Sequence, residues 1–169
     1  MGTYAFIDSQ NVNLAIRDAG WILDFLKLRM YLAKKYGVTK AFLFIGYVPK
    51  YRNLYQFLRQ AGYTIVFKPT VLLGKDKAKG NVDAELVLHA MIEYLNYKRA
   101  IIISGDGDFY CLVDYLRQQN KLLRLIIPNR YKYSSLFRRH NFDLVYLTDL
   151  RIILEKQKRE ALPQDQAFG

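Results

Sequence analysis

The chain has 169 residues and a formal net charge of +11, from 26 Lys and Arg residues against 15 Asp and Glu residues. This length is typical of one domain, and a hydrophobic content of 51% supports a globular protein with a buried core. The positive charge favours an anionic partner such as nucleic acid, and the alternative is a generally basic, solvated surface.

The single cysteine, Cys111, excludes an internal disulfide bond and a zinc site built on cysteines. Its neighbours Phe109, Leu112 and Val113 suggest a small core residue and not a nucleophile. The N-terminal residues form a short apolar run that meets Asp8, without a basic leader, and no stretch reaches about 18 apolar residues. We therefore expect a cytoplasmic protein without a membrane partner.

The first half of the chain alternates between apolar runs and helical patterns. Strands are expected at residues 4–7, 41–45 and 64–67, and helices at residues 11–19, 25–36 and 49–61. Asp24 can cap the second helix. Gly20, Gly37 and Gly62 each follow a helix at a position suited to end it. Residues 68–80 then form the longest irregular segment, and such long loops are usually functional or mobile.

The second half continues the alternation. Strands are expected at residues 100–103, 122–127 and 144–146. Asn81 is expected to cap a fourth helix, and a fifth helix runs to about residue 119. A short helix then carries Arg138 and Arg139. A last helix, capped by Thr148 or Asp149, frays after about Lys158. Residues 128–135 form a basic, aromatic loop between the fifth strand and the short helix.

This alternation predicts the fold class. Strands alternate with helices about six times and are near-continuous apolar runs, as expected when both faces of a sheet are covered. We predict one α/β domain over residues 1–158, a Rossmann-like three-layer fold with a mostly parallel central sheet of about five to six strands flanked by helices. The polar residues 159–169, which include Pro163, are expected to form a flexible C-terminal tail.

Four aspartates are expected at one edge of this sheet, because right-handed parallel crossovers place every strand-to-helix loop on the same edge. Asp8 ends the first strand, Asp106 and Asp108 follow the fourth, and Asp83 lies in the first turn of a helix entered from that edge. Like charges held close together are costly unless a cation neutralises them. Hard oxygen ligands select Mg²⁺ or Mn²⁺, and no set of His or Cys residues suggests zinc.

Each acid also has a purely structural interpretation. Asp8 and Asp106 could cap the helices that follow them, and Asp83 and Asp108 could complement a helix dipole. Ser104 could hydrogen-bond a metal ligand, or it could be only a small residue at a tight turn. The coincidence of four acids on one predicted edge favours a functional site.

Basic and aromatic loops are predicted on the same edge of the sheet. Phosphate-binding cations interleaved with stackable rings suit single-stranded nucleic acid, although each patch alone could be a solvated loop. The cations that we expect to bind it are Lys50, Arg52, Lys75, Lys77, Lys79, Arg130, Lys132 and Arg138.

Three blocks of sequence carry a family resemblance. They are Phe6-Ile-Asp-Ser-Gln-Asn-Val12, Lys79-Gly-Asn-Val-Asp-Ala-Glu85 and Ser104-Gly-Asp-Gly-Asp-Phe109. In order and spacing they resemble the signature blocks of the NYN domain, a PIN-like family whose bacterial branch includes the LabA-like proteins. The resemblance covers about residues 3–150 and implies a PIN-like fold with a divalent-metal ribonuclease site. The sequence departs from the family pattern at Ser9-Gln10, where Gly followed by an acid is common.

The resemblance also implies roles for individual residues. Metal-ligand roles fall on Asp8, Asp83, Asp106 and Asp108, and Asn11 and Ser104 complete the matched catalytic positions. One or two Mg²⁺ or Mn²⁺ ions, about 3.5–4 Å apart if two, would activate water and stabilise the leaving oxygen of an RNA phosphodiester. The basic loops would hold the RNA backbone.

Two functions follow from these observations. The first is a metal-dependent ribonuclease acting on single-stranded or structured RNA, and the alternative is a non-catalytic RNA-binding or regulatory module of the same fold. A haloacid-type phosphatase would need a second acid two residues after Asp8, where Gln10 stands. The aromatic-rich surface could also serve a homodimer.

Overall fold

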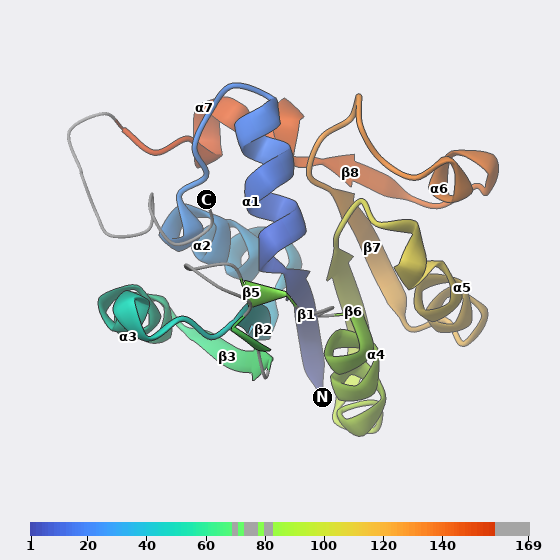
Figure 1. The fold of residues 1–169 in the computed structure, drawn as a ribbon. Helices are drawn as coiled ribbons and strands as arrows, with labels where there is room; N and C mark the ends of the chain where they lie inside the picture. Colours follow the sequence, from blue (N-terminus) through green and yellow to red (C-terminus); the bar gives the residue numbers. More distant parts are fainter. Residues whose placement is uncertain (69–70, 73–77, 80–82, 158–169) are drawn as a thin grey trace.

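A six-stranded, all-parallel sheet lies between two layers of helices (Figure 1). The computed structural model describes residues 1–68, 71–72, 78–79 and 83–157. The strands of the sheet are β1 (Gly2–Asp8), β2 (Val38–Gly46), β3 (Tyr63–Lys68), β6 (Tyr97–Ile103), β7 (Leu122–Ile127) and β8 (Leu144–Tyr146). The three-layer α/β fold predicted from the sequence is therefore confirmed.

The strand order places two strand ends together at the centre of the sheet. The order is β3-β2-β1-β6-β7-β8, so the chain builds outward from β1 to β3, then crosses over and builds outward from β6 to β8. The carboxyl ends of β1 and β6 thus meet where the sheet changes its direction of growth. In open α/β sheets this switch point is the usual position of a binding crevice.

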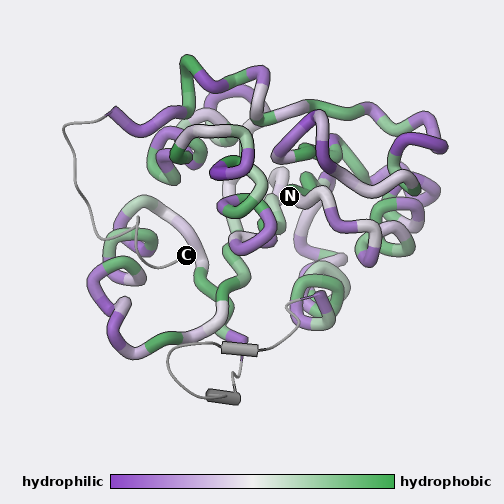
Figure 2. The backbone as a smooth tube through the Cα atoms, turned by 45° about the horizontal axis from the view of Figure 1, so that its top comes forward, coloured by the Kyte–Doolittle hydropathy of each residue, from purple (hydrophilic) through white to green (hydrophobic). Residues whose placement is uncertain are grey.

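Helices cover both faces of the sheet. One face carries α1 (Ser9–Asp18), α2 (Phe25–Tyr36), α3 (Arg52–Gln60) and α7 (Arg151–Leu154), and the other carries α4 (Asp83–Ile92), α5 (Tyr110–Gln118) and α6 (Ser135–Arg139). Short 3₁₀ turns are η1 (Pro49–Tyr51), η2 (Gly107–Phe109) and η3 (Leu147–Leu150). Hydrophilic and hydrophobic residues alternate along the helices, so that each helix turns an apolar face to the sheet (Figure 2).

The two faces of the sheet bury two separate cores, because successive side chains of a strand point to opposite faces. In β1, Ala5 and Ile7 belong to the core under α1, α2 and α3, whereas Phe6 belongs to the core under α4 and α5. Phe6 stacks on Phe42 of β2 with ring centroids 5.2 Å apart. Both cores are fully apolar at the sheet centre, and this fixes the register of the strands that carry the site.

The predicted helix ends are confirmed at several residues. The side chain of Asp24 caps α2 by accepting a hydrogen bond from the backbone N–H of Lys27 at 3.1 Å. Gly37 ends α2 in the left-handed conformation with φ of +64°, and Gly62 follows α3 with φ of +94°. Glycine adopts this conformation at no steric cost, which explains its use at both positions.

Two predicted elements were wrong. Within the segment expected to be irregular, β4 (Val71–Leu72) pairs antiparallel with β5 (Ala78–Lys79). The last helix was expected to reach about Lys158, but α7 ends at Leu154, and η3 rather than a capping side chain precedes it. Glu155 is extended and forms an antiparallel bridge with Leu23, a pairing that competes with further helix. Asn81 and the predicted tail at 159–169 lie outside the described residues.

Cys111 was expected in the core, and it is exposed. Helix α5 packs on the sheet through Leu112, Val113 and Leu116, and Cys111 falls outside this stripe. Its hydrophobic neighbours in sequence therefore misled the prediction, because helical periodicity decides which face a residue occupies. Among the helices in the described ranges, none is long and apolar enough to cross a membrane.

Replacing Tyr97 by Phe tests how α4 is anchored to the sheet. The buried hydroxyl of Tyr97 donates to the carbonyl oxygen of Ala90 at 2.9 Å, near the end of α4. We expect Tyr97→Phe to lower the free energy of unfolding by about 1–3 kcal/mol, because a buried carbonyl loses its partner. Urea denaturation followed by circular dichroism measures this. The exposed Tyr131 provides the control, since Tyr131→Phe should change stability by less than about 0.5 kcal/mol.

Candidate functional site

The register of β1 and β6 brings the first acid of the site to its position. Ile7 pairs with Ile103, so the next residues along the two strands, Asp8 and Ser104, lie side by side at the carboxyl edge. Asp8 is also the N-cap of α1 and accepts a hydrogen bond from the backbone N–H of Asn11 at 3.2 Å. Its capping role, predicted as an alternative to a catalytic one, is therefore real and coexists with its place in the site.

The buried hydroxyl of Ser104 links two acids. It donates to Oδ2 of Asp8 at 3.3 Å and accepts from the backbone N–H of Asp106 at 3.1 Å. A second bond fastens the same loop, because Oδ1 of Asn11 accepts from the backbone N–H of Gly105 at 2.9 Å. Ser104 and Asn11 thus position the loop that carries Asp106 relative to Asp8.

Three carboxylates form a compact cluster. One carboxylate oxygen from each of Asp83, Asp106 and Asp108 lies within 4.8 Å of the others. Asp106 caps η2, with its Oδ1 accepting from the backbone N–H of Asp108 at 3.0 Å. Asp83 begins α4, which packs against both β1 and η2. These three are among the four acids that the sequence analysis places at one edge of the sheet.

Asp8 lies beside this cluster and is more deeply buried than its three members, with 4% of its surface exposed. Burial, with a smaller contribution from the negative charges of Asp83 and Asp106, raises the pKa of Asp8 to about 6. The hydrogen bonds from Asn11 and Ser104 act in the opposite direction and lower the pKa. Burial is therefore the main reason that the ionised form of Asp8 is disfavoured, and the charges of Asp83 and Asp106 add to this effect.

The donor set fits a hard divalent cation. All members of the cluster offer carboxylate oxygens, which Mg²⁺ and Mn²⁺ prefer. One carboxylate oxygen from each of the three acids already lies within 4.8 Å of the others, so side-chain movements alone could bring them to a shared ion.

Ser9, one of the departures from the family pattern, has a structural role. Its buried hydroxyl donates to the carbonyl oxygen of Phe44 at 2.7 Å. This bond ties the start of α1 to β2 on the side of β1 away from Ser104. The residue that follows Asp8 therefore holds the strand end in place and contributes no acid to the site.

The cations expected to bind nucleic acid divide into two groups. Lys50 in η1 and Arg52 at the start of α3 are exposed beyond the end of β2. Lys79 lies in β5, and Lys75 and Lys77 lie outside the described residues. In the sequence, this group follows β2 and β3.

The second group follows β7, and its members are engaged by acids or rings. Arg130 forms an ion pair with Asp149 at 2.9 Å, and Lys132 forms one with Asp18 at 3.2 Å. The guanidinium of Arg138 lies over the ring of Tyr133, 4.6 Å from its centroid. Exposed ion pairs of this kind contribute little to stability, so these cations can exchange their partners for a ligand at small cost.

The sequence-based analysis missed the role of two glycines. Gly105 and Gly107 flank Asp106, and a Cβ atom at Gly105 would lie 3.1 Å from Cβ of Tyr133. A Cβ atom at Gly107 would lie within 3.0 Å of both Oγ and Cβ of Ser134. The loop between β7 and α6 therefore closes directly against the acidic loop. The Gly-Asp-Gly spacing was the available signal, but it gave no indication of which segment approaches.

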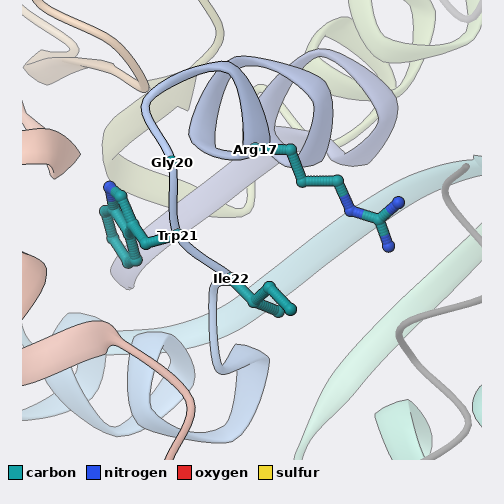
Figure 3. Close-up of a pocket in the computed structure, with 4 residues that line it drawn as sticks. All are labelled: Arg17, Gly20, Trp21 and Ile22. Atoms are coloured by element: carbon teal, nitrogen blue, oxygen red, sulfur yellow. The ribbon is translucent and has the colours of Figure 1, made fainter.

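An open hollow of about 380 Å³ lies at the far end of α1 from Asp8. It is lined by Arg17, Gly20, Trp21 and Ile22 (Figure 3). The side chains of Arg17 and Trp21 point in different directions, so polar atoms do not converge on the hollow (Figure 3). The acidic edge remains the better candidate for chemistry.

The fold and the site together define an α/β domain with acids at the switch point of a parallel sheet, the usual position of a crevice in such folds. We refer to Asp8, Asp83, Asp106 and Asp108 together as the acidic crevice. The sequence matches the model of the NYN domain over residues 3–143, and the chain belongs to this PIN-like nuclease family.

Two relatives support this assignment. The Low amplitude and bright protein LabA of Synechococcus elongatus is 25% identical over 167 residues, which cover 91% of this chain and 88% of LabA. A crystal structure of a protein of unknown function from Vibrio parahaemolyticus is 26% identical, with a TM-score of 0.73. That match covers 90% of this chain and 96% of the Vibrio chain. Both similarities therefore extend over nearly the whole domain.

The raised pKa of Asp8 predicts a pH-dependent stability. Between its unfolded value of 3.8 and its folded value of about 6, the folded state binds more protons than the unfolded state. The free energy of unfolding should therefore fall as pH rises through this window, by roughly 3 kcal/mol, and stay level above it. Asp8→Asn keeps a good N-cap residue and removes the titration.

We expect Asp8→Asn to match the wild type near pH 4 and to exceed its stability at pH 7.5. Urea denaturation of both proteins at the two pH values, in the presence of a chelator, measures the difference. The prediction is contradicted if the difference in free energy of unfolding between the two proteins is the same at both pH values.

Proposed function

We propose that this protein is a divalent-metal-dependent ribonuclease that hydrolyses RNA phosphodiester bonds at the acidic crevice. The observation that carries the proposal is the cluster of three carboxylates within 4.8 Å of one another, beside the buried Asp8. These acids come from three separate segments of the chain, and burial together with the charges of Asp83 and Asp106 makes the ionised form of Asp8 costly. A bound cation offsets that cost, which gives a physical reason for keeping the arrangement.

Each residue of the site has a proposed task. Asp8 and Asp106 are the central metal ligands, and Asp83 and Asp108 support the ion directly or through water. Ser104 and Asn11 position these ligands through the hydrogen bonds described above. One or two Mg²⁺ or Mn²⁺ ions would supply an activated water and stabilise the charge that develops on the leaving oxygen.

The cations around the crevice are proposed to bind the RNA backbone. Both groups follow strands of the sheet at its carboxyl edge, and the protein carries a net charge of +11. The positive surface concentrates an anionic polymer near the acidic crevice, and its contribution should weaken as salt rises. The expected contacts are Lys50, Arg52, Lys75, Lys77, Lys79, Arg130, Lys132 and Arg138.

Replacing Asp106 by Asn tests the catalytic assignment. Asn can still cap η2, so the fold should persist, but a neutral amide is a poor ligand for a hard cation. We expect cleavage of a mixed RNA substrate with Mn²⁺ to fall by more than about 100-fold. A gel assay of single-turnover cleavage measures the rate, and circular dichroism checks the fold.

Asp143→Asn is the matched control, because Asp143 is an exposed acid paired with Arg124 outside the cluster. Its cleavage rate should equal that of the wild type. Full activity in purified Asp106→Asn protein would remove Asp106 from the site. Tight RNA binding by a wild type that cleaves nothing with either Mg²⁺ or Mn²⁺ would instead identify a non-catalytic RNA-binding module.

Metal binding can be tested without any measurement of activity. A cation that binds only the folded state raises the free energy of unfolding by about 2.7 kcal/mol at 100 times its dissociation constant. We expect Mn²⁺ to raise the melting temperature of the wild type and of Asp143→Asn, and to leave Asp106→Asn nearly unchanged. An equal shift in all three proteins would place the bound cation outside the crevice.

A further inference from the structure

Two cations and two rings form a line near the carboxyl ends of β7 and β8, in the order Arg138, Tyr133, Tyr146 and Arg130. The guanidinium of Arg138 lies 4.6 Å from the centroid of the Tyr133 ring. The rings of Tyr133 and Tyr146 are 5.9 Å apart, and their hydroxyls are within hydrogen-bond distance at 3.2 Å. The guanidinium of Arg130 lies 5.0 Å from the centroid of Tyr146. We call these four residues the Arg–Tyr ladder.

The ladder begins next to the metal ligands. Tyr133 approaches Gly105 so closely that a Cβ atom at Gly105 would lie 3.1 Å from Cβ of Tyr133. The backbone N–H of Ser134 donates to the carbonyl oxygen of Gly105 at 3.0 Å. Gly105 directly precedes Asp106. The ladder therefore lies beside the loop that carries Asp106.

Hydrogen bonds fasten the loop that carries Arg130 and Tyr133 of the ladder. The side chain of Asn129 is buried, donates to the carbonyl oxygen of Ala15 at 3.2 Å and accepts from the backbone N–H of Tyr131 at 3.0 Å. The backbone N–H of Arg130 donates to Oγ1 of Thr148 at 3.3 Å. Because the backbone is fixed, the rings and guanidinium groups are presented at set positions, which lowers the entropy cost of binding a ligand.

Tyr131 extends this surface into solvent. Its side chain is 78% exposed, so its ring does not contribute to the hydrophobic core. Its carbonyl oxygen accepts a hydrogen bond from Arg138 at 3.4 Å, so the backbone of Tyr131 lies beside the ladder. An exposed ring on a fixed backbone is a suitable platform for a nucleotide base.

We propose that the Arg–Tyr ladder binds single-stranded RNA by stacking its bases and guides the strand into the acidic crevice. The inference rests on the proposed function and narrows its substrate class. Bases that are unstacked and unpaired can stack on tyrosine rings and guanidinium planes, whereas the bases of a duplex are already stacked on one another. Arg130 is paired with Asp149, so the ladder offers stacking surfaces more than free positive charge.

Binding measurements on a labelled single strand test the ladder. The probe is a fluorescein-labelled single-stranded RNA of mixed sequence and about 12 nucleotides, a length within the range of single-strand binding sites. Fluorescence anisotropy in a chelator prevents cleavage by metal. We expect Tyr133→Leu to weaken binding about tenfold, because one stacking platform is lost. Tyr133→Phe keeps the ring, and its affinity should stay within about twofold of the wild type.

The salt dependence separates stacking from charge. Arg138→Gln should weaken binding and reduce the slope of log affinity against log salt by about 0.7, the value for one phosphate contact on a single strand. Tyr133→Leu should leave this slope unchanged. Lys34→Gln, at an exposed lysine near the amino edge of the sheet, controls for net charge and should change neither quantity. Melting curves of every variant confirm that it folds.

Three results would overturn the ladder. The first is that both Tyr133→Leu and Arg138→Gln bind the single strand with wild-type affinity. The second is that the wild type binds the single strand and a duplex of the same sequence with equal affinity. The third is that the wild type binds no RNA. The proposed nuclease fails separately. If the wild type binds through the ladder but cleaves no RNA with Mn²⁺, the nuclease proposal is wrong and the ladder proposal stands. If the wild type cleaves RNA but the ladder variants bind with normal affinity, the ladder proposal is wrong and the nuclease proposal stands.

Discussion

The hydroxyl of Ser104 is the contact on which the acidic crevice depends. It joins Oδ2 of Asp8 at the end of one strand to the backbone N–H of Asp106 beyond the neighbouring strand. This contact exists only because β1 and β6 are parallel neighbours with Ile7 opposite Ile103. The strand order that builds the sheet outward from its centre is therefore also what assembles the site from segments nearly 100 residues apart.

The same arrangement works against stability. A buried acid whose pKa is raised to about 6 disfavours folding at neutral pH, and the nearby charges of Asp83 and Asp106 contribute to this shift. Two apolar cores, one on each face of the sheet, compensate by fixing the strands through side chains that are almost fully buried. An unfavourable charge arrangement at one edge, supported by a regular core, is common at functional sites.

The sequence predicted those features that follow from local pattern and from topology rules. The bounds of the strands at 122–127 and 144–146 and the end of α2 at Gly37 were correct. The convergence of the acids was predictable because parallel crossovers place strand-to-helix loops on one edge. The exposure of Cys111 and the pairing of Leu23 with Glu155 were not predicted, because packing around a helix and contacts between distant segments leave little trace in local sequence.

The glycines around Asp106 show what such a distant contact can mean for function. In the sequence, Gly105 and Gly107 indicated only a tight turn between a strand and a helix. In the structure they leave room for Tyr133 and Ser134, nearly 30 residues further along the chain. A side chain at either position would crowd the loop that carries Tyr133 and Ser134, slightly at Gly105 and more severely at Gly107. The small size of these residues therefore couples the chemistry of the acids to the surface proposed to deliver a strand to them.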